Sequence, residues 1–190
     1  HFGGTGLPED STGYHNNATA STATAVPASF AGAGVSVGAG RSIKVGPSPS
    51  MSVTGSKGYT ASIWAKIDTA QPNGVLVFVG DNGQGFALGI NGNKPYAQAG
   101  STVISSSGDV ATGEWHFLAA SAVGGQIILY VDGAEVARGK AVIPDLNGAV
   151  TLGADSAGAR PFAGEIDEVG LSKAPRSAEW LKAMALGGLD

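Results

Sequence analysis

Glycine is spread along this chain at a density that disfavours most helical folds. Thirty-one of the 190 residues are glycine, roughly twice its ordinary share of about 7%, and they follow no fixed period. Each glycine inside a helix costs about 1 kcal/mol relative to alanine. Turns between short strands, in contrast, use the left-handed backbone that glycine adopts freely. The chain is therefore expected to consist mainly of short strands joined by tight turns.

Alternation of side-chain types supports this expectation. In the clearest segment, Tyr59 to Ile67, one face carries Ala61, Ile63, Ala65 and Ile67, as the period of two in a strand requires. Further strands are predicted over 75–79, 86–90, 114–122, 126–131, 134–138, 149–152 and 163–171, with shorter pieces near 18–20, 35–37 and 42–45. A turn is predicted at 71–74, because Pro-Asn-Gly is typical turn chemistry.

Only the C-terminal tail has the pattern of a helix. Ser177 is placed to cap its N-terminus, and Glu179 lies in the first turn, where an acidic side chain complements the helix dipole. The predicted apolar stripe of this helix is Trp180, Leu181, Met184 and Leu186. Many strands followed by one helix predict an all-β fold, an antiparallel two-sheet β-sandwich with a short C-terminal helix. We expect residues 1–190 to form one domain.

Composition excludes several classes of function. Charged residues make up 14% of the chain and the net charge is −4, and no run of Lys and Arg indicates nucleic-acid binding. A neutral ligand or an apolar partner fits this balance better than a polyanion. No stretch approaches the 18 apolar residues expected of a membrane-inserting helix. Cysteine is absent, which excludes disulfides and thiolate chemistry. The chain begins at His1, and we read it as a piece of a longer or processed protein.

Five segments, in order, resemble one family. They are DSTGYHNNA over 10–18, YTASIWAK over 59–66, GEWHF over 113–117, LYVDG over 129–133, and FAGEIDEV over 162–169 with a helix start at 174–179. Together they resemble the laminin-G-like, concanavalin A-like lectin and glucanase domains, which implies a jelly-roll sandwich. One departure lies at the start, where Gly3 and Gly4 replace the acidic pair that is usual in the family. The fold carries lectins, adhesion modules, glucanases and spacers, so the resemblance alone does not choose among these functions.

Hydrolysis is the least favoured of these functions. The family's glucanases use Glu-x-Asp followed shortly by a second glutamate, and Glu165 and Asp167 match the first part of that pattern. Val169 and Gly170 stand where the second glutamate belongs. Retaining hydrolysis needs two carboxyl groups about 5–5.5 Å apart, and no partner acid is visible here. We therefore predict that the chain is not an enzyme.

The resemblance implies a structural calcium site that ties the opening loop to the last long strand. Its side-chain ligands would be Asp10 and Asn16 in the loop and Asp167 in the strand. Calcium takes 6–8 oxygen ligands, so backbone carbonyls near Gly13 or Tyr14 would complete the set. In the alternative, Asp10 forms an Asx-turn and Asp167 makes a buried hydrogen bond. Of the two, we predict a bound structural Ca²⁺ ion.

The turns hold residue types that suit a sugar site. Such sites combine an aromatic ring with planar polar side chains that make directional hydrogen bonds. We expect hairpin geometry to bring the following residues to one rim: Asp81, Asn82, Gln84, Asn91, Asn93 and Tyr96. Trp64 shares a strand face with Ser62 and Lys66 and is expected on an exposed concave sheet. The alternatives are ordinary turn residues and a Trp64 packed in the core.

The preferred interpretation is a non-catalytic carbohydrate-binding or adhesion-type module of a larger bacterial protein. Its expected partner is a glycan or polysaccharide, and a protein partner is also possible. The resemblance implies a location that is extracellular, at the cell surface or periplasmic. The alternative is a protein-interaction or spacer module without a sugar site. An exposed aromatic ring beside amide side chains would favour the lectin, an acid pair in a groove the enzyme, and a featureless groove the spacer.

Overall fold

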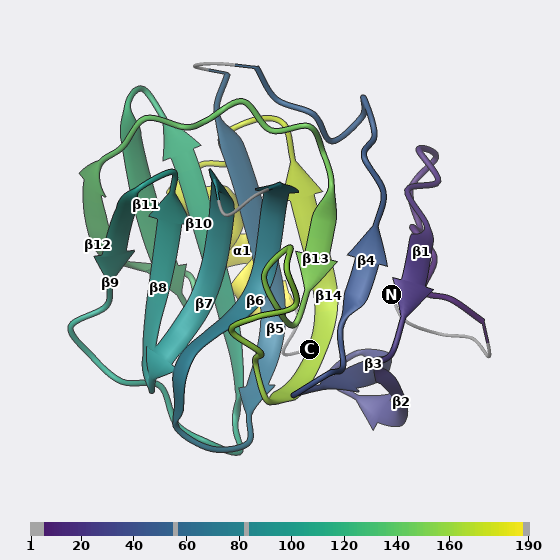
Figure 1. The fold of residues 1–190 in the computed structure, drawn as a ribbon. Helices are drawn as coiled ribbons and strands as arrows, with labels where there is room; N and C mark the ends of the chain where they lie inside the picture. The colour runs from purple at the N-terminus through teal and green to yellow at the C-terminus, as the bar shows by residue number, and fades with distance from the viewer. Residues whose placement is uncertain (1–5, 55–56, 82–83, 188–190) are drawn as a thin grey trace.

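Two antiparallel seven-stranded sheets pack face to face in the computed structural model of this chain (Figure 1). The structure describes residues 6–54, 57–81 and 84–187. In spatial order, the front sheet of Figure 1 contains β1 (Ala18–Ser21), β4 (Ile43–Val45), β13 (Val150–Leu152), β6 (Gln71–Asp81), β7 (Gln84–Gly92), β8 (Lys94–Ala99) and β9 (Thr102–Ser105). The back sheet contains β12 (Ala134–Lys140), β11 (Gln126–Val131), β10 (Trp115–Val123), β5 (Tyr59–Ile67), β14 (Gly164–Ser172), β3 (Gly32–Val37) and β2 (Thr24–Ser29).

The predicted all-β sandwich with one short C-terminal helix is confirmed. Strands β5 and β11 have the predicted bounds, because clear alternation and glycine turns mark both. The turn predicted at 71–74 is wrong: Gln71 pairs with Gly92 and Gly74 with Ile90, so this segment opens β6 through an irregular register. The predicted strands also omitted β2, β8 and β9, each of which has six residues or fewer.

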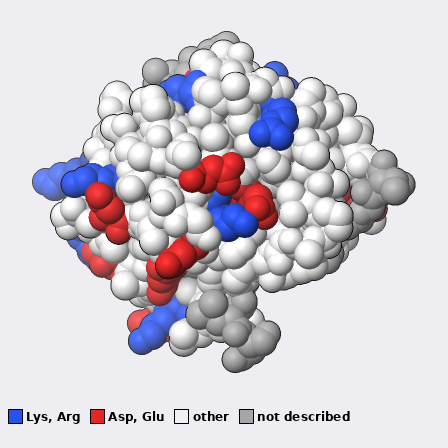
Figure 2. Space-filling model, turned by 90° about the horizontal axis from the view of Figure 1, so that it is seen from below, with Lys and Arg blue, Asp and Glu red and all other residues white. Residues whose placement is uncertain are grey.

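Few charges lie on the surface. The chain has 15 acidic and 11 basic side chains. On the face drawn in Figure 2, acidic and basic groups lie beside one another near the centre, and most of the area is uncharged. Electrostatic attraction to a polyanion therefore has no focus on this face. Among the described residues, no helix is long and apolar enough to cross a membrane.

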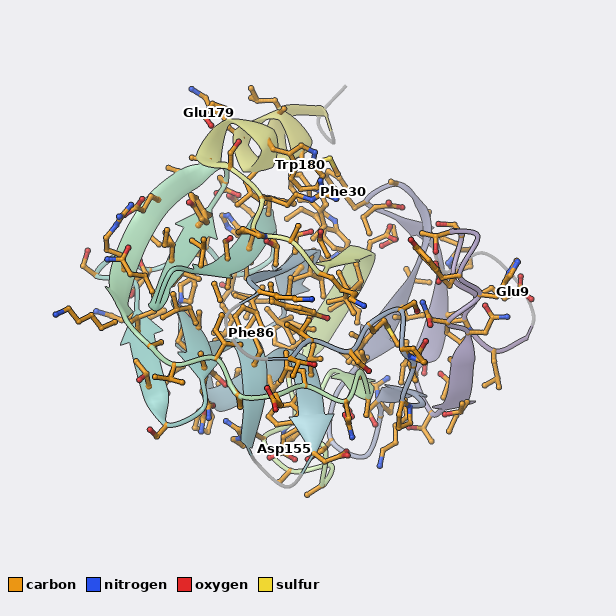
Figure 3. The ribbon with its side chains drawn as sticks, turned by 90° about the horizontal axis from the view of Figure 1, so that it is seen from above. Glu9, Phe30, Phe86, Asp155, Glu179 and Trp180 are labelled. Carbon is orange, nitrogen blue, oxygen red and sulfur yellow. The ribbon has the colours of Figure 1, made fainter. Side chains whose placement is uncertain are left out.

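The core fills the space between the two sheets. The inward residues of β5 are those that the alternation predicts, and Ala61, Ile63, Ala65 and Ile67 have no exposed area. Phe86 of the front sheet lies between the layers in Figure 3, and its ring meets the ring of Tyr59 edge-on at 5.5 Å. Burying apolar area on both inner faces holds the sheets together, at about 25 cal/mol per Å² removed from water.

A single helix, α1 (Ala178–Gly187), covers the outer face of the back sheet. Its N-terminus is capped as predicted, since the Ser177 hydroxyl accepts a hydrogen bond from the Trp180 N–H at 3.3 Å. The predicted apolar stripe is wrong for Trp180, Met184 and Leu186, which are 38%, 44% and 57% exposed. The buried face consists of Leu181 and Ala185, which pack on aromatic side chains of the back sheet.

A loop over residues 153–162 covers part of the opposite face of the molecule, outside the front sheet. Figure 3 shows Asp155 on this side, with α1 at the far side of the two sheets. Backbone hydrogen bonds fix the loop to β6: the Gly153 N–H donates to the Leu76 carbonyl, and the Val75 N–H donates to the Arg160 carbonyl, each at 2.9 Å. The fully buried Phe162 ends it. The loop therefore forms a raised wall on the front sheet.

Candidate functional site

A shallow hollow of about 240 Å³ lies on the outer face of the front sheet, which we call the sheet groove. The start of β6, the β7–β8 turn, strands β8 and β9, and the 153–162 loop surround it. Its lining residues are Asn73, Asn91, Tyr96, Gln98, Val103, Ser105 and Arg160. Most of these side chains are polar and planar, so the groove collects hydrogen-bonding groups in a chain that is otherwise poor in charge.

Tyr96 lies on the outer face of β8 because the adjacent strand leaves room for its ring. It pairs with Gly89 of β7, and a Cβ atom added at Gly89 would lie 2.6 Å from the Tyr96 hydroxyl. The ring is only 2% exposed, and the hydroxyl has no hydrogen-bond partner of good geometry among the described residues. Burial raises the pKa of Tyr96 to about 12, and the nearby Arg160 guanidinium opposes part of this rise. Tyr96 therefore keeps its hydroxyl proton.

The guanidinium of Arg160 enters the groove from the loop. Its Nε donates to Asp155 Oδ2 at 3.0 Å, and its Nη1 donates to Gln98 Oε1 at 3.3 Å. Asp155 also shapes the loop, because its Oδ1 accepts from the Ala157 and Ala159 N–H groups at 3.1 and 2.8 Å. The ion pair and the backbone contacts hold Arg160 in place, while Asp155 itself does not line the groove.

Two asparagines form one end of the groove. Asn91 is exposed at the β7–β8 turn, and its Oδ1 accepts from the Asn73 N–H at 3.3 Å. Asn73 adopts a left-handed backbone with φ of 51°, a conformation that asparagine tolerates better than most residues. The groove thus places an aromatic ring, three amide side chains and one guanidinium around a single hollow.

The prediction that six turn residues share one rim is wrong. In the antiparallel sheet, Asp81 pairs with Gln84 at one end of β7, and Asn91 pairs with Lys94 at the other. Nine residues of strand at about 3.3 Å each separate these ends. Of the predicted rim residues whose side chains the structure describes, only Asn91 and Tyr96 line the groove.

The remaining predicted rim residues have other surroundings. Asp81 accepts a hydrogen bond from the Asn147 side chain. The Asn93 carbonyl accepts from the Val110 N–H at 2.9 Å, and its side-chain oxygen is buried. Asn82 lies outside the described residues, and for Gln84 only the strand position is described. Neither Asp81 nor Asn93 lines the groove.

The expectation of an exposed Trp64 is also wrong. Its side chain is 4% exposed, because Phe30 from the β2–β3 turn stacks on it with ring centroids 3.8 Å apart. Phe117, Leu181 and Ala185 complete the cluster. Trp64 therefore packs the helix side of the back sheet, as the alternative interpretation held.

The three predicted calcium ligands lie in two different settings. The Asp10 carboxylate accepts from the Thr12 N–H and hydroxyl and from the Asn16 N–H and side-chain amide at 2.8–3.1 Å. Burial alone would raise the pKa of Asp10, but these hydrogen bonds outweigh it and lower the pKa. The fully buried Asp167 instead accepts from the Ala31 and Glu168 N–H groups at 3.0 and 2.9 Å. The three side chains as arranged do not converge on one ligand set, so calcium binding stays a prediction from the family resemblance.

A larger cleft of about 480 Å³ opens at the N-terminal edge of the sandwich, between the segment before β1 and the second half of β14. Apolar side chains from both sheets form its floor: Ala18, Ile43, Val45, Met51, Val150, Leu152, Val169 and Leu171. Asp10 and Asn16 stand at its rim, where the Asn16 Oδ1 accepts from the Ser50 hydroxyl at 2.8 Å. We call this space the edge cleft. Its floor belongs to the sandwich core.

The carboxyl groups of the Glu-x-Asp segment are both engaged. Glu165 forms an ion pair with Lys66 at 2.6 Å, and Asp167 is sealed by the backbone contacts given above. A carboxylate that serves as a nucleophile must face a substrate, and Asp167 has no exposed area. The arrangement gives no retaining acid pair at these two residues.

The sequence matches a family model over residues 37–182. The two antiparallel sheets agree with this match. The chain belongs to the concanavalin A-like lectin/glucanases superfamily. A comparison with curated protein sequences finds no match. Membership in the superfamily fixes the fold and leaves the function to the site.

Solved structures extend the likeness to known members of this fold. Domain 4 of AbnA, an extracellular arabinanase from Geobacillus stearothermophilus in complex with arabinotriose, is 21% identical with a TM-score of 0.69, over 87% of this chain and 82% of that chain. The binding domain of botulinum neurotoxin serotype G is 11% identical with a TM-score of 0.75, over 94% of this chain and 48% of that chain. The binding domain of botulinum neurotoxin DC, in complex with SialylT, is 14% identical with a TM-score of 0.70, over 95% and 48%. This chain thus spans about half the length of the toxin binding domains, and the identities show a shared fold alone.

Sequence reasoning missed five of the groove residues: Asn73, Gln98, Val103, Ser105 and Arg160. Alternation within 94–99 would have placed Gln98 on the same face as Tyr96. Nothing local indicates Arg160, because it comes from a loop that meets β8 only in the folded chain.

Proposed function

We propose that this chain is a non-catalytic sugar-binding module and that the sheet groove is its binding site. The observation that carries the proposal is the gathering of the Tyr96 hydroxyl, three amide side chains and the Arg160 guanidinium in one hollow. Sugars present many hydroxyl groups that donate and accept, and planar amides and guanidinium groups suit them. A rigid sheet holds these side chains in place, as a specific site requires.

Superfamily membership supports the proposal without deciding it. Two structural neighbours were solved in complex with a ligand, one with arabinotriose and one with SialylT. The engaged state of Glu165 and the burial of Asp167 favour binding over hydrolysis. A location outside the cell or at its surface, which the resemblance implies, would give such a module access to polysaccharides.

The experiment that tests the proposal is a glycan array probed with the purified chain in parallel with two variants. Asn91→Ala removes an exposed amide at the end of the groove, so we expect it to weaken specific binding about tenfold. Asp81→Ala alters a polar residue at the opposite end of β7 and should leave binding unchanged. Repeating the array with calcium and with chelator tests whether a metal ion supports the site.

Three outcomes would overturn the proposal. A blank array under both conditions would favour a protein-interaction or spacer module. Binding that Asp81→Ala abolishes and Asn91→Ala spares would move the site to the other end of the sheet. Release of shortened glycan by the wild type would show instead that the module is catalytic.

Protein binding is the second candidate function. The edge cleft favours it, because its floor is apolar and two of the floor residues, Val169 and Leu171, are only half-buried. One structural neighbour, the binding domain of botulinum neurotoxin DC, was also solved in complex with rat synaptotagmin II.

A further inference from the structure

We infer that the sheet groove selects sugars that carry a carboxylate, and that Tyr96 and Arg160 bind this group. The inference rests on the proposed sugar-binding function and deepens it by naming the ligand class. It follows from an imbalance between hydrogen-bond donors and acceptors in the groove.

The first unbalanced donor is the Tyr96 hydroxyl. It is buried, and it has no partner of good geometry in the described part of the chain. Its interaction with Arg160 engages the hydroxyl oxygen, since a guanidinium has donors and no acceptor, so the hydroxyl proton still lacks an acceptor. A buried hydrogen-bond donor that lacks an acceptor costs about 1–3 kcal/mol. The Tyr96 side chain lines the groove but is 2% exposed, so a ligand acceptor reaches the hydroxyl, and removes this cost, only when neighbouring groove side chains move aside.

The second source of donors is Arg160. A guanidinium has five N–H groups in a fixed fork, and the hydrogen bonds to Asp155 and Gln98 use one group each. The side chain is 24% exposed, and its Asp155 partner is 14% exposed. A ligand in the groove therefore meets the guanidinium, while Asp155 lies in the loop and does not line the groove.

Donors that converge without an acceptor favour a carboxylate over a hydroxyl. An ionised carboxylate only accepts, and it can accept from both a hydroxyl and a guanidinium at once. A sugar hydroxyl also carries a proton, which must point away from both donors. Hydrogen bonds between charged partners are roughly twice as strong as neutral ones, so a carboxylate gains more from the same two residues.

The size and charge of the groove limit the ligand to one acidic sugar. The hollow of about 240 Å³ is smaller than the roughly 300–1,000 Å³ of sites for drug-sized ligands. Arg160 is the one charged residue among the described groove-lining residues, and the chain has a net charge of −4. A polyanion would gain one ion pair and meet repulsion elsewhere. A single uronic-acid-type residue in an otherwise neutral glycan fits both limits.

Calorimetric titration with matched ligand pairs tests the inference. The acidic probes are short oligosaccharides that end in one glucuronic or galacturonic acid. The neutral probes are the same oligosaccharides after carboxyl reduction, which converts the carboxylate to a primary alcohol. We expect the wild type to bind the acidic form at least about tenfold more tightly.

Three variants assign the preference to residues. Tyr96→Phe removes a hydroxyl whose proton lacks an acceptor, together with its interaction with Arg160, so the melting temperature should change little while affinity for the acidic form falls about tenfold. Tyr59→Phe is the matched control, because Tyr59 also has a buried, unpartnered hydroxyl, but in the core between the sheets. It should leave binding unchanged. Arg160→Gln should abolish the preference for the acidic form.

The outcomes separate this inference from the proposed function. Equal binding of acidic and reduced forms, lost in Asn91→Ala, would overturn the inference and keep the sugar-binding module. A preference for the acidic form that survives in both Tyr96→Phe and Arg160→Gln would overturn the assignment to this groove. Binding of neither form would overturn the sugar-binding proposal together with the inference.

Discussion

The two hollows of this molecule differ in how well their polar groups are satisfied. The edge cleft is twice as large, at about 480 Å³ against about 240 Å³ for the sheet groove. In the cleft, Asp10 bonds Thr12 and Asn16, and Lys173 Nζ donates to the Pro49 carbonyl at 2.8 Å. In the groove, the Tyr96 hydroxyl proton has no acceptor within residues 6–54, 57–81 and 84–187. The larger hollow is thus an edge of the core whose rim groups bond to one another, and the smaller one holds donors without an acceptor among the described residues.

The comparison shows that the volume of a cavity is a poor guide to its function. A cavity lined by core side chains contributes to stability through apolar burial, whether or not a ligand enters it. A buried donor without an acceptor is costly, and a folded chain that keeps one gains when a ligand supplies the acceptor. Substitutions in the cleft should therefore change stability most, and substitutions in the groove should change binding most.

The largest expected effect on stability comes from the floor of the cleft. Ile43 is 1% exposed and lies in β4 between β1 and β13. Ile43→Ala should lower the free energy of unfolding by about 2–5 kcal/mol, measured by urea denaturation. Val103→Ala, at a 55% exposed position on the groove wall, is the control and should cost less than about 0.5 kcal/mol. Similar losses in both variants would contradict the contrast between the two hollows.

A substitution in the groove wall should lower the free energy of unfolding less than Ile43→Ala does, but it should lower ligand affinity strongly. Asp155→Ala removes the partner of Arg160 and two backbone contacts in the 153–162 loop. We expect a cost of about 1–3 kcal/mol and loss of glycan affinity, because Arg160 is released from its position. Chemical denaturation and titration on the same sample separate the two effects. Affinity that persists in this variant would show that Arg160 needs no support from the loop.

The rim of the cleft should respond more weakly. Asp10→Ala removes the hub of the opening loop, with an expected cost of roughly 1–2 kcal/mol. Since the pKa of Asp10 is lowered in the folded chain, its contribution is present above the unfolded pKa near 4 and is lost as pH falls through the folded pKa. If calcium binds at Asp10, as the family resemblance implies, the cost should be larger with calcium than with chelator, and equal costs would contradict that prediction. A rise in the wild-type melting temperature on adding calcium, absent in Asp10→Ala, would establish a metal site in this loop.

The smallest expected effect is a pH dependence of the free energy of unfolding, with no change in ligand affinity. His116 Nδ1 lies 2.9 Å from Asp132 Oδ2, and this hydrogen bond raises the pKa of His116. Its contribution is present below the unfolded pKa near 6.5 and is lost as pH rises through the folded pKa. Between pH 6 and 8 the free energy of unfolding of the wild type should fall by less than about 1.4 kcal/mol. The fall over the same pH range should be smaller in His116→Gln, measured by urea denaturation at each pH.

Affinity in the groove should stay flat over the same range of pH. The described groove-lining residues include no group that titrates there, since the pKa of Tyr96 is raised to about 12. Titrations at pH 6, 7 and 8 check this expectation. A change in affinity that tracks the His116 transition would link the two sheets.

The strands that were predictable are those whose pattern is local. Alternation in Tyr59–Ile67 sets which side chains face the core, and the Gly124-Gly125 turn sets the β10–β11 hairpin, with both glycines at positive φ. Trp64 was placed on the correct face, but its burial depends on Phe30, which lies 34 residues earlier in the chain. No local pattern contains that contact.

The site was predictable only in part, for the same reason. Asn91 and Tyr96 have the residue types of a sugar site, and both line the groove. Arg160 reaches them from a loop that lies about 65 residues later, and Asp81 was excluded only when the strand directions were known. Residue type identifies candidates, whereas the pairing of strands decides which candidates share a hollow.

The loop over 153–162 has a consequence for engineering new specificities. Asp155 closes the loop on itself, through its own N–H to the Ala159 carbonyl and through its carboxylate to Ala157, Ala159 and Arg160. Contacts with β6 anchor its two ends. A randomised library confined to residues 156–159 would therefore vary the wall of the groove on an intact sandwich, much as antibody loops vary on a constant framework.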